Sequence, residues 1–553
     1  MAMKILAVTS EVFPLAKTGG LGDAVSGLAH ALCNSGAELT LMLPAYPAAL
    51  RKLGTLRELA KLEGLPGGDA RLLGAFCAEL GVRVLLLKND ALYDRKGLYM
   101  AADGTEYQDN AIRFAALSQA AARVAKGLDG VDRPHVVHAH DWHAALTPLF
   151  MRQLHVEDVK TVLTLHNVAF QGIFPMELAP QLGIEPSYCD GKGLEYWGRM
   201  NFLKAGIRYA DLITVVSRNY AREILTAQFG CGLEGVLADR RADLVSIPNG
   251  IDTTLWNPQD DAYLHGLSFS HECLANKAKC KSRLQRRFGL LDTPGATVMA
   301  LGSRLTTQKM ADVAVEALPL ALQAHPQLQV CVIGEGEKRL EQALSDLERQ
   351  YPGRCGVHVG FDESEAHLLH AGADVLLHGS RFEPFGLTPL YSMRYGTIPI
   401  GSRVGGMADT IVDPGVQRPA AAMRAATGIL FSGDHPRDMV LAIGRAMALH
   451  DMPEIWHAMQ MNGMRSDFSW SNTAPAYLSA FQALRPDVAL DRIPEVQRDQ
   501  LRGRSRQTVV SSTALARQGP RLAPGTLVQR MPAGVSPGGV GTGSLATNEA
   551  SAA

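Results

Sequence analysis

Four short segments of the chain combine polar or charged side chains with turn residues, the places where ligand-binding groups concentrate. The first is Lys17-Thr-Gly-Gly-Leu21, between an apolar run and a stretch, 23–33, that is typical of a helix. Adjacent glycines let backbone amides approach an anion, and a helix N-terminus adds partial positive charge. Many Gly-Gly turns only connect elements, so this signal is weak alone. It matches neither the P-loop nor the Gly-x-Gly-x-x-Gly pattern, and supports neither an ATPase nor a dehydrogenase.

The second segment, His138-Ala-His-Asp-Trp-His143, ends a predicted strand. Three histidines and a carboxylate suggest zinc, and strand alternation puts His138 and His140 on one face. No cysteine or acid pair elsewhere completes a metal-binding spacing, so we favour a polar strand end at a ligand cleft and predict no metal. His166-Asn167 ends the next strand and should lie on the same rim. A lone histidine is more often structural, but two polar strand ends side by side weaken that interpretation.

The third segment, Ser303-Arg-Leu-Thr-Thr-Gln-Lys309, follows a strand in the second half of the chain. Arg304 and Lys309 place two cations on one strand-to-helix loop, which suits a diphosphate or another leaving anion. A pair of surface cations is the simpler alternative. Gly334-Glu-Gly336 and Gly405-Gly406 are further loops after strands, so several anion-compatible loops are predicted around one cleft.

The fourth segment, Arg381-Phe-Glu-Pro-Phe-Gly-Leu-Thr388, follows the strand 374–378. Its Glu383 lies in a tight loop that contains Pro and Gly. A lone carboxylate there can cap a helix. Facing cationic loops, it can instead stabilise positive charge that develops on a sugar ring, or bind the sugar hydroxyls.

The elements that position these segments alternate between short apolar strands and helical stretches, the pattern of buried parallel sheets. A first series of predicted strands comprises Lys4–Thr9, Glu38–Leu43, Val82–Lys88, His135–Ala139, Thr161–His166 and Leu212–Ser217. A second series comprises Thr297–Gly302, Leu328–Ile333, Gly356–Phe361, Asp374–His378, Thr397–Ile400 and Gly428–Phe431. The turn at 247–252 separates the two series, so we predict two α/β domains with a ligand site in the cleft between them.

Composition excludes several classes of function. The chain has 553 residues, more than one core usually supports, which agrees with two large domains. Lys+Arg is 54 and Asp+Glu is 55, a balance of −1 that argues against a nucleic-acid binder or a protein held on membranes by charge. We find no apolar run near the roughly 18 residues of a membrane helix, and the N-terminus is typical of a first strand and not a signal peptide. Eight cysteines without a Cys-x-x-Cys motif suggest reduced thiols in the cytoplasm.

The end of the chain has a different composition. From about Pro494 it is dominated by Gly, Pro, Ser, Thr and Ala, and no aromatic residue follows Phe481. Such a segment buries too little apolar area to offset its ordering entropy, so we predict that it is disordered. Six arginines and one acid after residue 500 give the tail a charge of +5 and leave −6 on the remainder. A soluble extension is the favoured interpretation, and contact with an anionic partner is the alternative.

Taken together, the motifs resemble those of bacterial glycogen synthases and the related plant starch synthases. The matches run in the family's order over residues 1–485: Lys17-Thr-Gly-Gly-Leu21, His138-Ala-His-Asp-Trp-His143, His166-Asn167, Pro248-Asn-Gly250, Ser303-Arg-Leu-Thr306 with Gln308-Lys309, Ser380-Arg-Phe-Glu-Pro384 and Gly405-Gly406 with Ala408-Asp409. One match alone would be chance, but the ordered series is very specific.

The resemblance implies an α/β protein of the GT-B fold, with two Rossmann-like domains that face a central cleft and a disordered C-terminal tail. The expected parts are an N-terminal domain (1–248) with the acceptor site and part of the donor site, a C-terminal nucleotide-sugar domain (249–468), a helix (469–486) that packs back on the first domain, and the tail (494–553). The implied activity is transfer of glucose from ADP-glucose to the non-reducing 4-OH of an α-1,4-glucan with retention of configuration. No cofactor, metal, nucleic acid or membrane is implied.

The resemblance also implies roles for individual residues. Lys17 and the amides of Gly19 and Gly20 would contact the donor phosphates, and Arg304 and Lys309 would neutralise the departing diphosphate. The donor sugar would be held by residues of both domains: Glu383, Asp141, His166, Asn249, Gly405, Gly406 and, with a weaker match, Tyr93.

The chain departs from the family's usual pattern near the donor loops. Phe385 replaces a common Cys, Pro389 a Gln, Met310 a Gly, Val404 a Thr and Met407 a Leu. These changes leave open a different turnover or nucleotide preference, such as UDP-glucose, or a catalytically weak glucan-binding regulatory protein. A related transferase with a small acceptor is the other alternative. Many such enzymes carry a second Glu eight positions after the first, where this chain has Tyr391.

Overall fold

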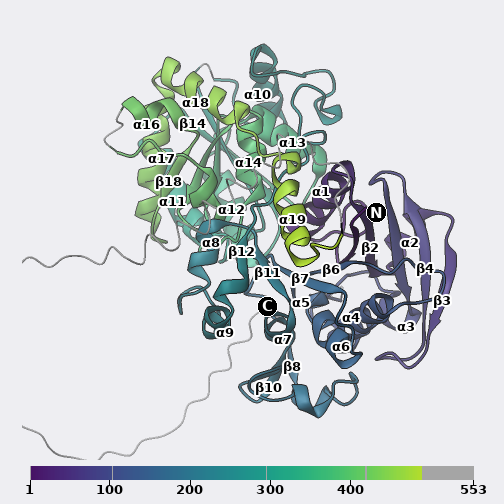
Figure 1. Cartoon of the computed structure of the whole chain (residues 1–553). Helices are drawn as coiled ribbons and strands as arrows, with labels where there is room; N and C mark the ends of the chain where they lie inside the picture. The colour runs from purple at the N-terminus through teal and green to yellow at the C-terminus, as the bar shows by residue number, and fades with distance from the viewer. Residues whose placement is uncertain (1, 102–103, 294, 417–419, 489–553) are drawn as a thin grey trace, which may run out of the picture. The chain divides into compact units, whose positions relative to one another are not determined.

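The computed structural model describes residues 2–101, 104–293, 295–416 and 420–488 (Figure 1). Residues 1–98 and 108–492 belong to one compact unit, which contains all the helices and strands discussed below. Within the segment 99–107, the Tyr107 amide donates to the Tyr99 carbonyl at 3.0 Å and closes a short turn. The predicted tail, 494–553, lies outside the described residues.

The first sheet has nine strands in the order β12-β11-β7-β6-β1-β2-β5-β4-β3. Its seven parallel strands are β1 (Lys4–Val8), β2 (Glu38–Pro44), β5 (Val82–Lys88), β6 (Val136–His140), β7 (Lys160–Leu165), β11 (Leu212–Val215) and β12 (Leu244–Ser246). The antiparallel strands β3 (Arg57–Leu62) and β4 (Ala70–Cys77) extend one edge. Strand order reverses between β1 and β6, and ligands of open α/β sheets bind at the carboxyl ends of strands at such a switch point.

The second sheet has six strands, all parallel, in the order β15-β14-β13-β16-β17-β18. They are β13 (Thr297–Gly302), β14 (Leu328–Gly334), β15 (Cys355–Val359), β16 (Val375–His378), β17 (Ile398–Ser402) and β18 (Ile429–Phe431). Order reverses between β13 and β16. The loops that carry Lys309 and Glu383 follow these two neighbouring strands, so the fold brings them together. The predicted class, α/β with two Rossmann-like domains, is confirmed.

Helices connect the strands. Those associated with the first sheet are α1 (Gly20–Asn34), α2 (Pro47–Leu53), α3 (Asp90–Tyr93), α4 (Asn110–Lys126), α5 (Asp141–Ala144), α6 (Thr147–Gln153), α7 (Phe202–Tyr209), α8 (Arg218–Glu223) and α9 (Glu234–Asp239). Those that follow are α10 (Ala275–Arg287), α11 (Ala311–Ala324), α12 (Lys338–Gln350), α13 (Glu363–Gly372), α14 (Leu387–Arg394), α15 (Gly405–Thr410), α16 (Ala420–Ala425), α17 (Pro436–His450), α18 (Pro453–Arg465) and α19 (Trp470–Leu484). None of the helices in the described part is long and apolar enough to cross a membrane.

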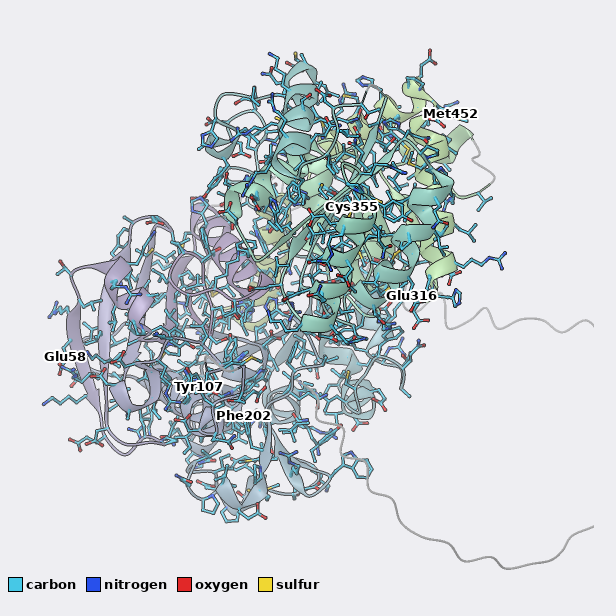
Figure 2. All side chains as sticks on the ribbon, turned by 180° about the vertical axis from the view of Figure 1, so that it is seen from behind. Glu58, Tyr107, Phe202, Glu316, Cys355 and Met452 are labelled. Atoms are coloured by element: carbon cyan, nitrogen blue, oxygen red, sulfur yellow. The ribbon has the colours of Figure 1, made fainter. Side chains whose placement is uncertain are left out.

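A small antiparallel sheet lies between β7 and α7 in the chain. It is formed by β8 (Ile173–Pro175), β9 (Glu195–Tyr196) and β10 (Arg199–Asn201) in the order β8-β10-β9. Short 3-10 helices are η1 (Met176–Leu178), η2 (Pro186–Tyr188), η3 (Arg241–Asp243) and η4 (Ala262–Leu264). Figure 2 shows the described side chains from the opposite side, with Phe202 at the start of α7 and Glu316 on α11.

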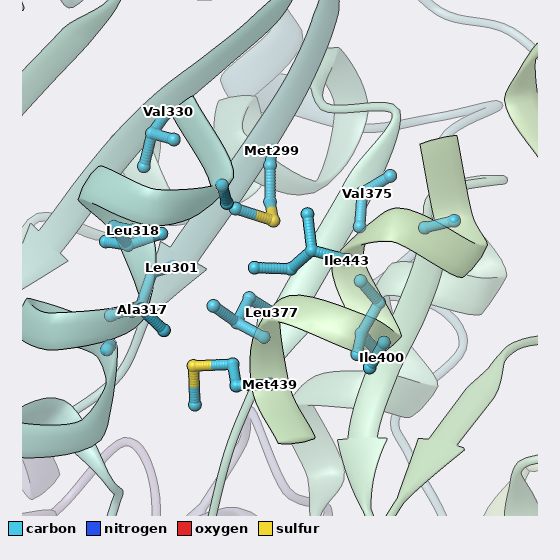
Figure 3. Packing of buried hydrophobic residues seen from close by; sticks show 14 of the residues in the cluster. Met299, Leu301, Ala317, Leu318, Val330, Val375, Leu377, Ile400, Met439 and Ile443 are labelled. Carbon is cyan, nitrogen blue, oxygen red and sulfur yellow. The ribbon is translucent and has the colours of Figure 1, made fainter. Parts of the chain in front are cut away.

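The core of the second domain shows why its strands read as uninterrupted apolar runs. β13 is buried along nearly its whole length, as expected for a parallel strand with helices on both faces. Met299 from β13, Leu377 from β16 and Ile443 from α17 pack together in this core (Figure 3). All three are at most 2% exposed, so the sheet is held by close packing that also fixes the strand ends where the motif loops begin.

Helix α19 follows the second domain but packs on elements of the first. It lies beside α1 (Figure 1). The approach is close at Gly27, where a Cβ atom would lie 2.0 Å from Trp470 Nε1. Further along, the rings of Tyr477 and Phe481 lie 5.4 and 5.5 Å from that of His138 on β6. The C-terminal helix therefore contacts the back of the strand that ends in the His-rich motif.

Candidate active site

The motif residues of the first domain follow β1, β6 and β7, three neighbouring strands at the switch point. Asp141 begins α5 directly after β6, with a left-handed φ of 55°. Its Oδ1 accepts hydrogen bonds from the backbone amides of His166 at 2.7 Å and Asn167 at 3.2 Å. Burial raises the pKa of Asp141 to about 7, although the two amide donors lower it. The carboxyl group thus joins the ends of two strands and titrates near neutral pH.

The histidines of this rim contact one another and the sheet. His140 Nδ1 lies 3.0 Å from His166 Nε2, and His138 Nε2 lies 2.6 Å from Thr164 Oγ1. Burial lowers the pKa of His166 to about 3. The imidazole is therefore neutral at physiological pH and acts as a hydrogen-bonding group, not as a cation. Among the described residues, no group of three or more His, Cys, Asp or Glu is placed to hold a metal ion.

The Lys17 loop is held by two carboxylates. Lys17 Nζ lies 2.9 Å from Asp23 Oδ1, and the lysine side chain is 29% exposed. Glu11, only 3% exposed, accepts from the Thr18 amide and hydroxyl, both at 2.7 Å, and from the Gly19 amide at 3.1 Å. The amide of Gly19, predicted to contact phosphate, is thus engaged by Glu11 in this structure. Sequence reasoning missed Glu11, and its place shortly after the first strand was the available signal.

The same loop lies against the second domain. A Cβ atom at Gly20 would lie 3.6 Å from Leu387 Cδ1, at the first residue of α14. Leu387 comes four residues after Glu383. The Lys17 loop and the Glu383 loop, almost 370 positions apart in the sequence, are therefore neighbours.

In the second domain, Lys309 and Glu383 form a buried ion pair. The two side chains are 13% and 12% exposed, and Lys309 Nζ contacts Glu383 Oε2 directly. Ser380 Oγ donates to the same carboxylate oxygen at 3.2 Å, and His378 Nε2 lies 3.5 Å from it. Burial opposes ionisation of Glu383, but Lys309 and His378 outweigh it and hold the pKa of this carboxyl well below its ordinary value. Glu383 is consequently a fixed negative charge, and not an acid that delivers a proton.

Arg304, the other predicted cation, is exposed, and its Nη2 donates to Gln308 Oε1 at 3.4 Å. Gln308 in turn donates from Nε2 to the Phe382 carbonyl at 2.8 Å. The loop after β13 is therefore tied to the loop after β16 by backbone contacts as well as by the ion pair. His378 was not predicted, although its position at the end of β16 beside Glu383 was a usable signal.

The glycine pair at 405–406 packs on the backbone of the Glu383 loop. Gly405 has a φ of 46°, and a Cβ atom there would lie 1.5 Å from the Glu383 carbonyl oxygen. The Gly406 amide donates to the Pro384 carbonyl at 3.1 Å. Only a residue without a side chain fits at 405, so this pair supports the loop from behind.

Two further predicted residues differ in their surroundings. Asn249 is 8% exposed, and its Oδ1 is buried without a hydrogen-bond partner among the described residues. An unpaired buried amide oxygen is costly, which is consistent with a ligand contact. Tyr93 is only 1% exposed, and its hydroxyl donates to the Arg113 carbonyl at 2.6 Å. Its hydroxyl therefore has a backbone partner, and its ring lies 6.3 Å from the ring of Tyr46.

Met310 and Phe385, two of the departures from the family's pattern, are buried at 1% and 4% exposure. Met310 precedes α11 with a left-handed φ of 55°, and its Cβ would lie 3.2 Å from a Cβ built at Gly379. Glycine adopts this backbone conformation without strain, which explains why a glycine is common at this position in the family's pattern. Here the side chain instead fills space in the core beside β16.

A cavity of about 460 Å³ adjoins the motif loops. Asn167 and Tyr220 line it from the first domain, and Ser380, Phe382 and Val404 line it from the second. This volume lies within the range of small-molecule sites. The cavity thus has lining residues from both domains, and Ser380 connects it to the Glu383 carboxylate through a hydrogen bond of 3.2 Å.

Comparison with known proteins agrees with this geometry. A family model described as starch synthase catalytic domain matches residues 4–239, and one described as glycosyl transferases group 1 matches residues 285–458. A glycogen synthase from Bordetella petrii is 57% identical over 489 residues, which are 88% of this chain and 94% of that protein. One from Ralstonia nicotianae is 51% identical over 487 residues, 88% of this chain and 89% of that protein.

Solved structures show the same fold. The catalytic domain of starch synthase IV from Arabidopsis thaliana, bound to ADP and acarbose, superposes with a TM-score of 0.79 at 26% identity and covers 87% of this chain and 99% of that chain. A sucrose-phosphate synthase from Thermosynechococcus elongatus has a TM-score of 0.55 at 17% identity over 88% of this chain and 100% of that one, a likeness of fold alone.

Two α/β domains with polar loops at both switch points, together with the glycosyltransferase matches, define a glycosyltransferase of the GT-B type. Identities above 50% over almost nine-tenths of the chain define it more narrowly. The chain belongs to the glycogen synthase family. The predicted family and enzyme class are thus confirmed.

Proposed function

We propose that this enzyme transfers glucose from ADP-glucose to the non-reducing 4-OH end of an α-1,4-glucan with retention of configuration. The observation that carries the proposal is the Lys309–Glu383 pair at the switch point of the second sheet. The pair combines a cation for a leaving diphosphate with a carboxylate for a sugar ring. Ser380, which donates to Glu383, lines one cavity together with Asn167 from the end of β7. The relatives named glycogen synthase supply the acceptor class, and the starch synthase bound to ADP supplies the nucleotide.

The cations stabilise the leaving group. Cleavage of the bond between the anomeric carbon and the phosphate oxygen places negative charge on ADP. Arg304 and Lys309, both on the loop after β13, would neutralise this charge, and Lys17 would contact it from the first domain. Preorganised charges in a water-poor site contribute strongly to such reactions, because they need no rearrangement as the charge develops.

The sugar ring is held by fixed polar groups. Glu383 is ionised because Lys309 and His378 hold its pKa low. It can therefore accept hydrogen bonds from glucose hydroxyls and stabilise positive charge on the ring. His166 is neutral, so it adds a hydrogen bond without opposing that positive charge. Asn249, whose buried Oδ1 has no hydrogen-bond partner among the described residues, would complete the sugar contacts.

Retention follows if the acceptor attacks from the side of the leaving group. The bond from the anomeric carbon to the 4-oxygen of the glucan forms as the bond to the phosphate oxygen breaks. The proton of the 4-OH passes to the departing phosphate oxygen, so no protein base is required. We assign the reacting sugars to the cavity lined by Asn167 and Ser380, because Ser380 also donates to the Glu383 carboxylate.

The donor is tested by incubating the full-length protein with glycogen and either labelled ADP-glucose or labelled UDP-glucose. We expect label in the polymer from ADP-glucose, and at most slight incorporation from UDP-glucose. Equal or greater use of UDP-glucose would overturn the donor assignment. Absence of incorporation from both donors would overturn the proposed transfer and favour a glucan-binding protein without turnover.

A further inference from the structure

Two short helices, α8 in the first domain and α15 in the second, each bind a backbone amide of the other through a carboxylate side chain. Both carboxylate oxygens of Glu223, the last residue of α8, accept from the Gly405 amide at 3.0 Å each. In return, Asp409 Oδ2 on α15 accepts from the Asn219 amide of α8 at 2.9 Å. Each carboxylate satisfies a first-turn amide that has no partner within its own helix. The contact is therefore reciprocal and made by charged acceptors.

The Glu223 side chain is held in place for this contact. Asn219 Nδ2 donates to Glu223 Oε1 at 2.6 Å, one helical turn away. At the other helix, the residue preceding α15 is Val404, which offers no side-chain acceptor to the free amides. The Gly405 amide is bound by a carboxylate from the other domain.

From Gly405 the contact continues to the sugar-binding carboxylate. The backbone of Gly405 lies so close to the Glu383 carbonyl that a Cβ atom would sit 1.5 Å from it. The next amide, that of Gly406, donates to the Pro384 carbonyl at 3.1 Å. A shift of α15 therefore displaces the backbone that carries Glu383, because close-packed backbone does not yield.

The same helix α8 also reaches the opposite rim of the site. Tyr220, 3% exposed, accepts a hydrogen bond on its hydroxyl oxygen from the Val168 amide at 2.9 Å. Val168 follows His166 and Asn167, whose amides are bound by Asp141. One helix of six residues thus binds the segment after β7 through Tyr220 and, through Glu223, the Gly405 backbone that packs on the Glu383 loop.

We infer that Glu223 is a positioning residue for catalysis, which couples the approach of the two domains to the placement of the Glu383 loop against the His166 rim. This inference rests on the proposed glucosyl transfer. It assigns α8 the task of setting the distance between the groups that hold the two sides of the sugar. A contact that only stabilises the folded chain would not affect turnover in the folded protein.

The test compares Glu223→Ala, Glu223→Gln and Asp409→Ala in the full-length protein, with Glu316→Gln as the control for loss of a negative charge. Glu316 is an exposed side chain on α11 and belongs to neither of the two helices in contact (Figure 2). Glutamine keeps an Oε1 that can accept from Gly405 and Asn219, whereas alanine removes it. The measurements are kcat and donor KM for glucose transfer to glycogen, with the folded fraction and melting temperature followed by circular dichroism.

We expect Glu223→Ala to lower kcat by about ten- to a hundred-fold with a much smaller change in donor KM, since misplacement of a reacting group by about 1 Å costs that much. Glu223→Gln should stay within about three-fold of the unmodified protein. Asp409→Ala should lower kcat in the same direction, and the Glu223→Ala/Asp409→Ala double variant should lose less than the product of the single effects, because both break one contact.

Three results would overturn the inference: wild-type kcat in folded Glu223→Ala, a loss in Glu223→Gln as large as in alanine, or multiplicative losses in the double variant. If Glu223→Ala does not fold, Glu223→Gln and Asp409→Ala are compared instead. A kcat that is kept in Glu223→Gln and lowered in Asp409→Ala supports the inference, and any other pattern overturns it. Inactivity of the unmodified protein would refute the proposed function instead, so the two failures are distinguishable.

Discussion

Substitution of Met310 by glycine and by alanine tests whether its left-handed backbone is a stored cost. Met310 has φ 55° and ψ 30°, and its side chain is 1% exposed in the core of the second domain. An L-residue in this conformation costs about 1–2 kcal/mol, which glycine avoids. Alanine keeps that cost and also loses the buried side chain.

The magnitudes predict an unusual order of stability. Loss of a buried Met side chain costs about 2–5 kcal/mol, so both variants should be less stable than the unmodified protein. Glycine recovers about 1–2 kcal/mol of backbone strain but loses about 0.4–1 kcal/mol through its more flexible unfolded chain. Met310→Gly should therefore be more stable than Met310→Ala by about 0.5–1 kcal/mol.

The assay is thermal unfolding followed by circular dichroism. For a domain of this size, 1 kcal/mol corresponds to about 2–4 °C, so the gap between the two variants is about 1–4 °C. Met459, 0% exposed in the interior of α18 and part of the same core, is the matched control. There alanine should be more stable than glycine by about 1 kcal/mol, because glycine is unfavourable in a helix. The same order at both positions, with alanine ahead, would refute the reasoning.

Three further predictions concern the site. Lys309→Ala and Glu383→Ala should each abolish most turnover and also destabilise the protein by about 3–5 kcal/mol, because each leaves a buried charge unpaired. The double variant should have a higher Tm than either single variant and stay inactive. Losses in Tm that simply add in the double variant would contradict this expectation. The pKa of Asp141 is about 7 in the folded protein against an ordinary value of 3.8. Its contribution to the free energy of unfolding is therefore fully present below pH 3.8 and is lost as the pH rises to 7. Asp141→Asn should therefore reduce the decrease of the unfolding free energy between pH 3.8 and 7 by up to about 1.4 kcal/mol per pH unit. The measurement is urea unfolding at a series of pH values, and the same pH dependence in the variant and the unmodified protein would contradict the raised pKa. Gly405→Ala should abolish transfer because its Cβ would overlap the Glu383 carbonyl, whereas Gly415→Ala, at φ 74° with open space around it, should lose only stability; activity assays on both variants check this, and an active Gly405→Ala enzyme would show that the loop can move.

Most of the parallel framework could be predicted from the sequence, because buried strands leave long apolar runs between helical stretches. Val82–Lys88 and Thr297–Gly302 have the predicted bounds in the structure. The edge strand β3 and its neighbour β4 were missed. β3 reads Arg-Glu-Leu-Ala-Lys-Leu and is half exposed, so it lacks the apolar run that marks an interior strand. Its antiparallel partner is β4, which in turn pairs with β5, and local sequence does not reveal this pairing.

The site was predictable where a residue ends a strand at a switch point. Asp141, His166, Lys309 and Glu383 all lie at such ends, and the fold brings each pair together. The partners that set their electrostatics were not predictable. Glu11 lies near the Lys17 loop in the sequence but becomes its acceptor only when the loop folds back so that the Thr18 and Gly19 amides meet the carboxylate. Partnerships of this kind depend on three-dimensional packing, which leaves no periodic signal.

Tyr93 shows that a sequence does not reveal the hydrogen-bond partner of a single side chain. Its expected role came from a short segment match, whereas its surroundings depend on the helix α4 that covers it. The hydroxyl donates to the backbone of Arg113, 20 positions away. A tyrosine with a satisfied hydroxyl and 1% exposure is indistinguishable in sequence from one at a cleft surface.

The central claim, retaining transfer to the glucan end, is tested most directly by proton NMR of the product. Full-length protein is incubated with ADP-glucose and a short linear α-1,4-glucan, and the anomeric signals are followed with time. We expect new α-1,4 signals that grow in step with the release of ADP. Release of ADP without a new linkage, or a new signal of β configuration, would contradict it.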